Sequence, residues 1–147
     1  MSFAMLAERI VIGNDLGELR RMSQWIRDIA NAVNLPNDMA FALDYCANEA
    51  VTNIISYAYE DSERHDIELE LTAAGQGARL VIRDDGKPFN APQAPEYIAP
   101  SSLADAHIGG LGIHLMRKLM AHCDYRREGN FNVLSLETQQ TNQTRNA

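Results

Sequence analysis

Glu49 and Asn53 stand four residues apart within residues 44–59, a stretch whose apolar residues recur with helical spacing. Residues four apart share one face of a helix, one turn apart, so this carboxylate and this carboxamide are neighbours. A carboxylate so placed can serve as a general base, and an amide oxygen can bind Mg²⁺. Taken alone, the pair is better explained as a solvated helix face with Glu49, Thr52 and Ser56 outward, because exposed glutamate is the common case.

Asp84 and Gly86 form a second element that could bind a ligand, at the end of a strand pattern. A carboxylate there can accept a hydrogen bond from an exocyclic amine such as adenine N6. The glycine lets the backbone come close to a flat ring. An ordinary turn is the alternative interpretation, since Asp and Gly are frequent in turns.

A third element is the glycine-rich segment Gly109, Gly110, Leu111, Gly112 and Ile113, which precedes an apolar helical pattern. Free backbone N–H groups at a helix N-terminus form an anion site that suits phosphates. The segment is neither a Walker loop nor a dinucleotide fingerprint, because it lacks Gly-Lys-Ser/Thr and does not follow a strand. Together and in this order, the three elements predict a nucleotide site.

The periodicity of the chain predicts the elements that must position these residues. Strands are expected at residues 7–12, 67–71, 78–83, 124–127 and 132–137, and helices from Asn14 or Asp15 to Val33, from 37 to about 59, and at 112–121. Gly75-Gln76-Gly77 predicts a hairpin turn. This order predicts an α+β two-layer sandwich, with a mixed, mostly antiparallel sheet covered on one face by helices.

The segment between the second and third elements has no sustained periodicity and holds four of the five prolines. A long irregular loop in a compact domain is more often functional than ornamental, so residues 87–109 are expected to form a lid, with a disordered insertion as the alternative. Residues 1–137 are expected to form one domain, followed by a disordered polar tail at 138–147.

Composition and charge argue against several classes of protein, among them nucleic-acid-binding and membrane-spanning proteins. The formal net charge of −7 argues against nucleic acid as a partner, since phosphate backbones are bound by clustered Lys and Arg. No apolar run approaches the ~20 residues that span a bilayer, and the start of the chain lacks the features of a signal peptide, which predicts a cytoplasmic protein without membrane contact. Cys46 and Cys123 form no C-x-x-C motif and are expected to be buried free thiols.

Four segments carry a resemblance to a known family: NEAVTN (48–53), DDGKPF (84–89), IGGLGIHLMRKL (108–119) and EGNFNVLSLE (128–137). They resemble the motifs and the closing strand of the GHKL (Bergerat-fold) ATPases. The chain looks most like the subgroup of bacterial anti-sigma-factor serine/threonine kinases, and the resemblance extends from about Arg9 to Glu137.

The resemblance implies a role for each site residue, with ATP and Mg²⁺ as cofactors. It makes Glu49 the general base, Asn53 the Mg²⁺ ligand, Asp84 the adenine-binding carboxylate, Gly86 a neighbour of the base, Gly110 and Gly112 the residues that let lid amides reach the phosphates, and Ser135 the counterpart of a threonine linked to the adenine Asp through water.

The function implied is a kinase that phosphorylates a Ser or Thr of a STAS-domain anti-anti-sigma protein, with a sigma factor as a further partner and a homodimer as the expected assembly. Two alternatives stay open. An ATP-gated binding module without significant kinase activity is favoured by residues 91–108, which contain no Arg or Lys, so that Lys87 is the nearest cation. A histidine-kinase catalytic domain is weakened because no phospho-acceptor helices are expected before Ala7.

Overall fold

The computed structural model describes residues 5–88 and 116–138. Within them the chain forms one sheet with strand order β1-β2-β3-β5-β4, and every pairing of neighbouring strands is antiparallel. The strands are β1 (Met5–Gly13), β2 (Asp66–Ala74), β3 (Gly77–Asp84), β4 (Met120–Glu128) and β5 (Phe131–Thr138). β5 thus lies between β3 and β4, although it follows both in the sequence.

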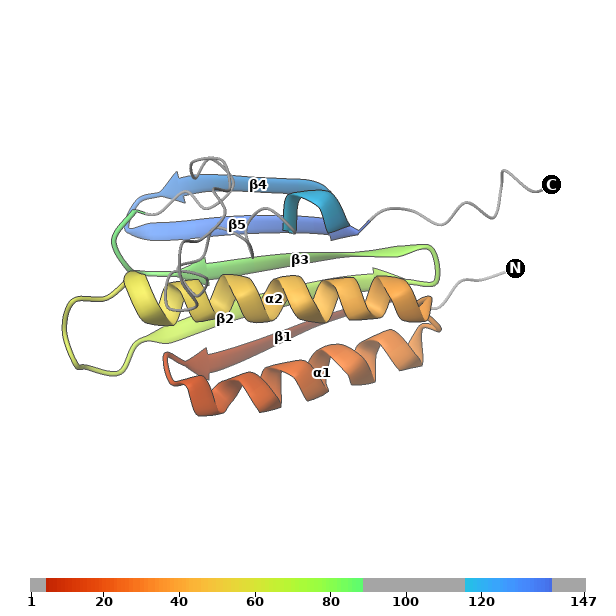
Figure 1. Cartoon of the computed structure of the whole chain (residues 1–147), viewed down its shortest axis with the longest axis horizontal. Coiled ribbons are helices and arrows are strands. Elements are labelled where there is room, and N and C mark those ends of the chain that lie inside the picture. The colour runs from red at the N-terminus through yellow and green to blue at the C-terminus, as the bar shows by residue number, and fades with distance from the viewer. Residues whose placement is uncertain (1–4, 89–115, 139–147) are drawn as a thin grey trace, which may run out of the picture.

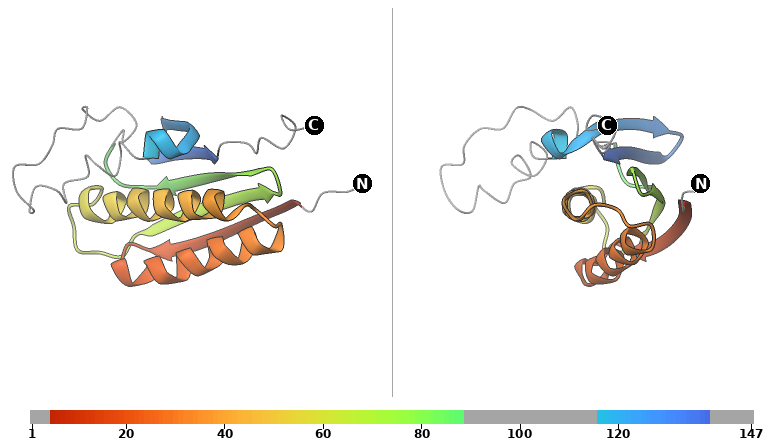
Figure 2. Two further views of the ribbon diagram at one scale, coloured as in Figure 1. Left: turned by 45° about the vertical axis from the view of Figure 1, so that its right-hand side comes forward. Right: turned by 90° about the vertical axis from the view of Figure 1, so that its right-hand side faces the viewer.

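Two long helices lie side by side across one face of the sheet (Figures 1 and 2). α1 (Leu19–Ala32) contacts β1 and β2, and α2 (Asn37–Tyr57) contacts β3 and β5. The hydrophobic core lies between the helices and this face. The layered α+β arrangement predicted from the order of elements is confirmed.

The first helix begins later than its pattern indicates. Asp15 caps a short 3-10 turn, η1 (Leu16–Glu18), by accepting the N–H of Gly17 at 3.2 Å, and α1 follows directly. Met22, Ile26 and Ile29 are buried at helical spacing, as expected, whereas Leu16 is 57% exposed because it belongs to η1 and not to the amphipathic helix.

Alternation along three strands builds the core face of the sheet. The buried, helix-facing rows are Ile67, Leu69, Leu71 and Ala73 on β2; Ala78, Leu80, Ile82 and Asp84 on β3; and Asn132, Leu134, Leu136 and Thr138 on β5. The β3 row is apolar except for Asp84 at its last position. The β5 row is apolar except for Asn132 at one end and Thr138 at the other.

The last predicted helix ends two residues earlier than expected. A helical turn at 116–119 passes directly into β4, which begins at Met120. Met116 and Met120 are both buried. The apolar spacing therefore continues across the boundary, and no Gly or Pro marks where the helix stops.

The prediction that the polar tail begins at residue 138 is wrong for Thr138. This residue ends β5, its side chain is buried, and its Oγ1 accepts the N–H of Ala78 at 2.9 Å. The rest of the predicted tail, and the predicted lid from residue 89 onward, lie outside the described residues. No helix in the described ranges combines the length and the apolar character needed to cross a membrane.

Candidate functional site

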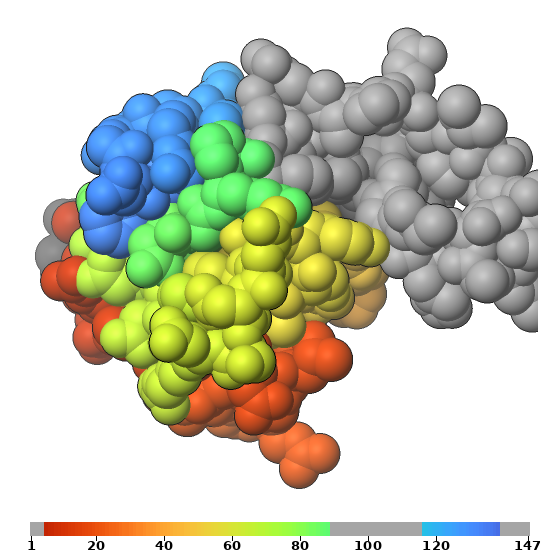
Figure 3. Space-filling view, turned by 90° about the vertical axis from the view of Figure 1, so that its left-hand side faces the viewer, coloured from red at the N-terminus to blue at the C-terminus, as the bar shows by residue number. Residues whose placement is uncertain are grey.

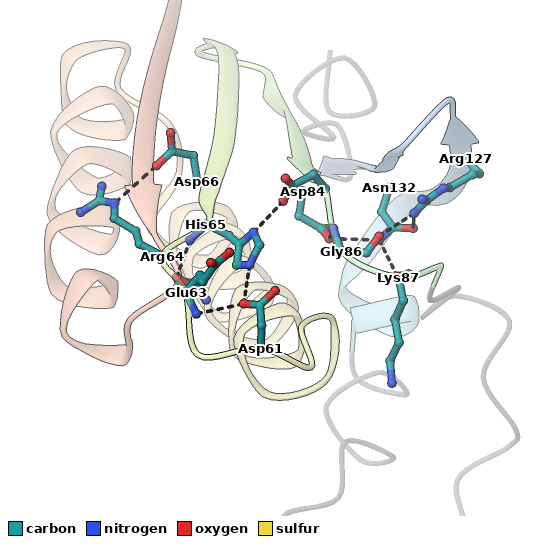
Figure 4. Close-up of polar contacts among 12 residues, drawn as sticks. Asp61, Glu63, Arg64, His65, Asp66, Asp84, Gly86, Lys87, Arg127 and Asn132 are labelled. Carbon is teal, nitrogen blue, oxygen red and sulfur yellow. Dashed lines mark hydrogen bonds and ion pairs between the residues drawn. The ribbon is translucent and has the colours of Figure 1, made fainter.

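Asp84 and Asn132 face each other across β3 and β5 at the same end of their core-facing rows. Asn132 donates through Nδ2 to Asp84 Oδ2 at 3.0 Å, and the N–H of Gly86 donates to the same oxygen at 2.9 Å (Figure 4). Asp84 is 3% exposed and Asn132 is 5% exposed. The carboxylate is therefore held inside the protein by two donors.

Asn132 is the centre of a larger network. Its Nδ2 also donates to the carbonyl of Lys87 at 2.8 Å, and its Oδ1 accepts from the hydroxyl of Tyr125 at 2.6 Å and from Arg127 at 3.1 Å. Arg127 donates in addition to the carbonyl of Gly86 at 2.7 Å. Since both ends of the amide are occupied, the side chain of Asn132 has one orientation and fixes the turn after β3.

The sequence prediction did not include Asn132. One signal could have found it: Asn132 begins the alternation that continues with Leu134 and Leu136, so it is a polar residue in the row that faces the core. A polar residue in such a row needs partners. Asp84 occupies the equivalent position of the β3 pattern, and the register brings the two together.

Burial raises the pKa of Asp84, although the hydrogen bonds from Asn132 and Gly86 act in the opposite direction. Both hydrogen bonds that Asp84 accepts within the described ranges use Oδ2. Among the described residues, none donates a hydrogen bond to Oδ1. A buried acceptor of this kind distinguishes a ligand that carries an N–H donor from one that does not.

Gly86 is needed for a reason that the sequence analysis did not give. A Cβ at this position would lie 2.5 Å from the Cβ of Ala58 and 2.6 Å from its carbonyl oxygen. The N–H of Lys87 donates to that same carbonyl at 2.9 Å. The turn after β3 is thereby packed against the end of α2, and Figure 3 shows the green segment lying between the yellow segment and the blue strands on one face of the molecule.

Glu49 and Asn53 both lie on α2, as predicted. Asn53 is 6% exposed, and its Nδ2 is buried without a hydrogen-bond partner. Glu49 is partly buried, and its negative charge contributes, after burial, to raising the pKa of Tyr45. The amide one turn from Glu49 therefore has hydrogen-bonding capacity that the surrounding described residues do not use.

The structure separates Ser135 from Asp84. Ser135 pairs with Val81, and it stands three residues along β5 from Asn132, the partner of Asp84. Because successive side chains alternate between the two faces of a sheet, Ser135 faces away from α2 while Asp84 faces toward it. The residue of β5 that contacts Asp84 directly is Asn132 and not Ser135. The residues of the glycine-rich element, 109–113, lie outside the described ranges.

The loop between α2 and β2 is fastened to the same turn. His65 stacks on Tyr59 with ring centroids 4.0 Å apart, and its ring nitrogens lie 2.8 Å from Asp61 Oδ1 and 3.4 Å from Asp85 Oδ1 (Figure 4). The hydrogen bond to Asp61 raises the pKa of His65. His65 thereby links the loop to the residue that follows Asp84.

Asp61, Glu63 and His65 bring candidate metal-ligand atoms within 4.8 Å of one another. Asp61 and Glu63 are exposed, and the Asp61 oxygen is already paired with the imidazole. The two cysteines are free thiols: Cys46 is buried and Cys123 is partly buried. Burial raises the pKa of Cys46 to about 12 and that of Cys123 to about 11, which keeps both protonated near neutral pH.

The chain is similar to several known proteins. The family described as "Histidine kinase-like ATPase domain" has a sequence model that matches residues 12–138. The chain is 34% identical over 112 residues to the serine/threonine-protein kinase BtrW of Bordetella bronchiseptica, which covers 76% of this chain and 79% of that protein. It is 24% identical over 96 residues to the serine-protein kinase RsbW of Bacillus velezensis, which covers 63% of this chain and 60% of that protein.

Two solved structures share the fold. The histidine kinase domain of the blue-light activated kinase EL346 of Erythrobacter litoralis has a TM-score of 0.52 at 18% identity, over 88% of this chain and 63% of that chain. A second structure of that kinase has a TM-score of 0.55 at 18% identity, over 88% of this chain and 42% of that chain. The chain thus spans less than two thirds of RsbW and of either solved structure.

The relatives confirm the resemblance that the four sequence segments carry, and the solved structures confirm the fold. The match to the family description extends from β1 to the end of β5, and so includes the Asp84 turn, Asn132 and the helix that holds Glu49 and Asn53. The chain therefore belongs to the histidine kinase-like ATPase domain family, within the GHKL ATPases of the anti-sigma kinase type.

Proposed function

We propose that this chain is an ATP-dependent serine/threonine protein kinase that phosphorylates a STAS-domain antagonist protein and so controls a partner-switching pathway. Its curated relatives are named serine/threonine- and serine-protein kinases. The observation that carries the proposal is the buried Nδ2 of Asn53, which has no hydrogen-bond partner and lies one turn from Glu49 on the helix whose far end holds the Asp84 turn.

Asp84 binds the adenine of ATP in this proposal. Its Oδ1 accepts the hydrogen bond of the N6 amine, while Oδ2 stays bound to Asn132 and Gly86. A buried carboxylate whose second oxygen is fixed in this way presents the first oxygen in one direction. Guanine carries a carbonyl oxygen in place of the N6 amine, so it would set two acceptors against each other.

Asn53 fits the role of Mg²⁺ ligand. Mg²⁺ prefers oxygen ligands and is commonly held by one or two protein side chains together with waters and substrate phosphates. The side chain of Asn53 is buried and lies on a long helix, and its Oδ1 would be the ligand atom. When bound, Mg²⁺ would offset the charge of the phosphates.

Glu49 acts as the general base. The hydroxyl oxygen of the acceptor Ser or Thr forms a bond to the γ-phosphorus, the bond from that phosphorus to the β–γ bridging oxygen breaks, and ADP leaves. The hydroxyl proton passes to the Glu49 carboxylate. Partial burial on α2 suits this role, since the carboxylate is both positioned and accessible.

The phosphorylated antagonist gains about two negative charges, which changes its affinity for its partners. A sigma factor or an equivalent target is the alternative partner in this pathway, the kinase acts as a homodimer, and a reaction of this kind takes place in the cytoplasm. The comparison with BtrW and RsbW supports the kinase, and the identity of each partner is part of the proposal.

A second candidate function is an ATP-gated binding module that transfers no phosphate. It is favoured by the absence of Arg and Lys from residues 91–108. It is favoured also by Lys87, whose ammonium lies 3.5 Å from Glu60 Oε1, next to the loop that follows α2 and not beside Glu49.

Glu49→Gln separates the two functions. This substitution keeps the shape of the side chain but removes the group that takes the proton, which typically lowers the rate 10²–10⁴-fold. We expect the variant to bind Mg²⁺-ATP as wild type does, by calorimetry, and to transfer almost no phosphate to purified STAS-domain proteins of the same genome, by intact mass. If wild type transfers none to any of them, the kinase is excluded and the binding module replaces it.

A further inference from the structure

Phe41 and Tyr45 form an aromatic patch at the beginning of α2. Phe41 is 70% exposed, the most exposed of the large hydrophobic side chains in the described ranges, and its ring stacks on that of Tyr45 with centroids 6.5 Å apart. Exposed aromatic pairs on a rigid helix are typical of protein-binding surfaces, because they bury a large area at little entropic cost.

The aromatic patch continues into the candidate catalytic residues. Four residues of α2 follow one another at intervals of four: Phe41, Tyr45, Glu49 and Asn53. Each therefore lies one helical turn from the next. At 3.6 residues per turn, such a row rotates by about 40° per step. The row accordingly passes from exposed at Phe41, through partly buried at Tyr45 and Glu49, to buried at Asn53.

The position of the aromatic patch along the axis of α2, relative to Glu49 and the Asp84 turn, indicates which ligand could reach it. The Asp84 turn is bound at Ala58, at the far end of α2. Glu49 stands nine residues before Ala58, about 14 Å along the axis at 1.5 Å per residue. In the proposed function, a nucleotide with its base at Asp84 and its phosphates at Asn53 would extend toward Glu49, and Tyr45 and Phe41 would then lie beyond its last phosphate.

We propose that the aromatic patch, Phe41 and Tyr45, is the docking surface for the protein that presents the phosphoacceptor hydroxyl to Glu49. The inference rests on the proposed kinase function, and it names the surface that the substrate protein contacts. Any hydroxyl that gives its proton to Glu49 comes from the side opposite to the adenine, and that side is the one on which α2 carries two aromatic rings.

Charge around the aromatic patch defines the partner further. Asp38 and Asp44 stand within three residues of Phe41, and Glu49 follows one turn after Tyr45. Asp44 is held in place by Asn48, which donates to it at 3.0 Å and to Ser23 of α1 at 2.9 Å. A partner face that is apolar and free of carboxylates fits this surface, and a phosphate newly formed on it would be repelled by these acids.

The test compares Phe41→Ala and Tyr45→Ala with Leu16→Ala. Leu16 is a matched control because it is also an exposed apolar residue, 57% exposed, but lies in η1 at the opposite end of the helical layer. The substrate is the purified STAS-domain protein of the same genome that wild type phosphorylates. We expect KM for this protein to rise about 10- to 30-fold in Phe41→Ala, as at an interface hot spot. The kcat of Phe41→Ala and its affinity for ADP should stay within twofold of wild type. The KM of the control, Leu16→Ala, should also stay within twofold.

Each other result has a defined meaning. An unchanged KM in Phe41→Ala overturns the docking surface, and so does a loss of ADP affinity or of folding that accompanies the rise in KM. A shift in homo-oligomeric state by light scattering at unchanged KM assigns the aromatic patch to a second copy of the chain instead. Phe41→Tyr, which keeps the ring, should restore the wild-type KM.

The proposed function can fail separately. If wild type binds a STAS-domain protein but transfers no phosphate to it, the kinase is excluded. The Kd of that complex, measured by calorimetry for wild type and Phe41→Ala, then decides the docking surface alone: a tenfold weakening supports it and an equal Kd overturns it. If no STAS-domain protein of the genome binds at all, both proposals are wrong.

Discussion

The N–H of Lys87 donates to the carbonyl oxygen of Ala58 at 2.9 Å, and so joins the turn after β3 to the last turn of α2. The final carbonyl groups of a helix have no partner within the helix. Here one of them is satisfied by the residue after Gly86, and the glycine allows the approach. The two motifs that the sequence carries 31 residues apart, Asn53 and Asp84, thus belong to one rigid unit.

Gly86→Ala tests the contact between the turn after β3 and the end of α2. A Cβ would have to fit 2.5 Å from the Cβ of Ala58 and 2.6 Å from backbone oxygen, distances at which something must move. We expect a loss of about 1–3 kcal/mol in the free energy of unfolding, by urea titration, as is usual for overpacking. Gly17→Ala is the control, because its Cβ would meet nothing closer than 3.4 Å. Equal stability of the two variants would contradict the close packing of Gly86 against Ala58.

Asp84→Asn should weaken ADP binding while the protein stays folded. The asparagine oxygen takes the place of Oδ2 and keeps the donors Asn132 and Gly86, so the amide NH₂ stands where the adenine amine would donate. A buried donor left unpaired costs about 1–3 kcal/mol, so the affinity for ADP by calorimetry should fall roughly five- to a hundred-fold. Unchanged affinity in a folded variant would remove Asp84 from the site.

In wild type, the buried carboxyl group of Asp84 makes stability depend on pH. Burial raises the folded-state pKa of Asp84 above its ordinary value of 3.8, so the folded state holds the proton more tightly than the unfolded state. The contribution of Asp84 to stability therefore falls as pH rises from about 3.8 through the folded-state pKa. Asp84→Asn should lack this loss. A thermal melt series across that window, with wild type and variant in parallel, measures the difference.

Asn132→Ala should weaken nucleotide binding although Asn132 is not expected to touch the nucleotide. Without its Nδ2, Asp84 Oδ2 and the carbonyl of Lys87 lose a donor, and the carboxylate is free to rotate. We expect about a tenfold loss of ADP affinity, in line with one lost charge-assisted hydrogen bond. The pKa of Asp84, followed by NMR, should rise further. A purely structural role would lower stability and leave that pKa unchanged.

Ser135→Ala is the matched control for Asn132→Ala. Both residues are buried on β5, but Ser135 faces the other side of the sheet, opposite Val81. We expect its ADP affinity to equal that of wild type. A loss of affinity comparable to that of Asn132→Ala would show that the sheet face does not decide which residue supports Asp84.

His65 gives the loop after α2 a dependence on pH. Its hydrogen bond to Asp61, with the nearby charges of Asp61, Asp85 and Glu63, raises its folded-state pKa above the ordinary value of 6.5. The contribution of His65 is therefore fully present below about 6.5 and is lost as pH rises through the folded-state pKa. His65→Asn should flatten the melting temperature across this window, whereas His122→Gln, on the exposed strand β4, should keep the wild-type slope.

The sequence predicted the layers, and it predicted the positions of those candidate residues that local spacing alone determines. Glu49 and Asn53 follow from a spacing of four on one helix, and Asp84 and Gly86 from a turn at a strand end. Asn132 was missed because its role depends on register: only the pairing of β3 with β5 brings it to Asp84. Ser135 was misplaced for the same reason, since a shift of three positions along a strand reverses the face.

Two boundaries were wrong for a different reason. Met120 continues an apolar helical spacing but begins β4, because pairing with Thr138 of β5 takes precedence over local preference. Thr138 looked like the first residue of a polar tail, yet its hydroxyl closes the ladder to Ala78. Both are tertiary effects that no window of local sequence contains.

The hydrogen bond from Asn132 to Asp84 spans 48 positions of the chain, and this separation sets an order of assembly. During synthesis, α2 and the β2–β3 hairpin leave the ribosome before β5 exists, so the nascent chain carries Glu49, Asn53 and Asp84 without the strand that orients the carboxylate. Non-local strand pairing is a slow step in folding. Nucleotide binding is thus a property that the chain acquires late, when the closing strand inserts beside β3, and it would report complete folding of the domain.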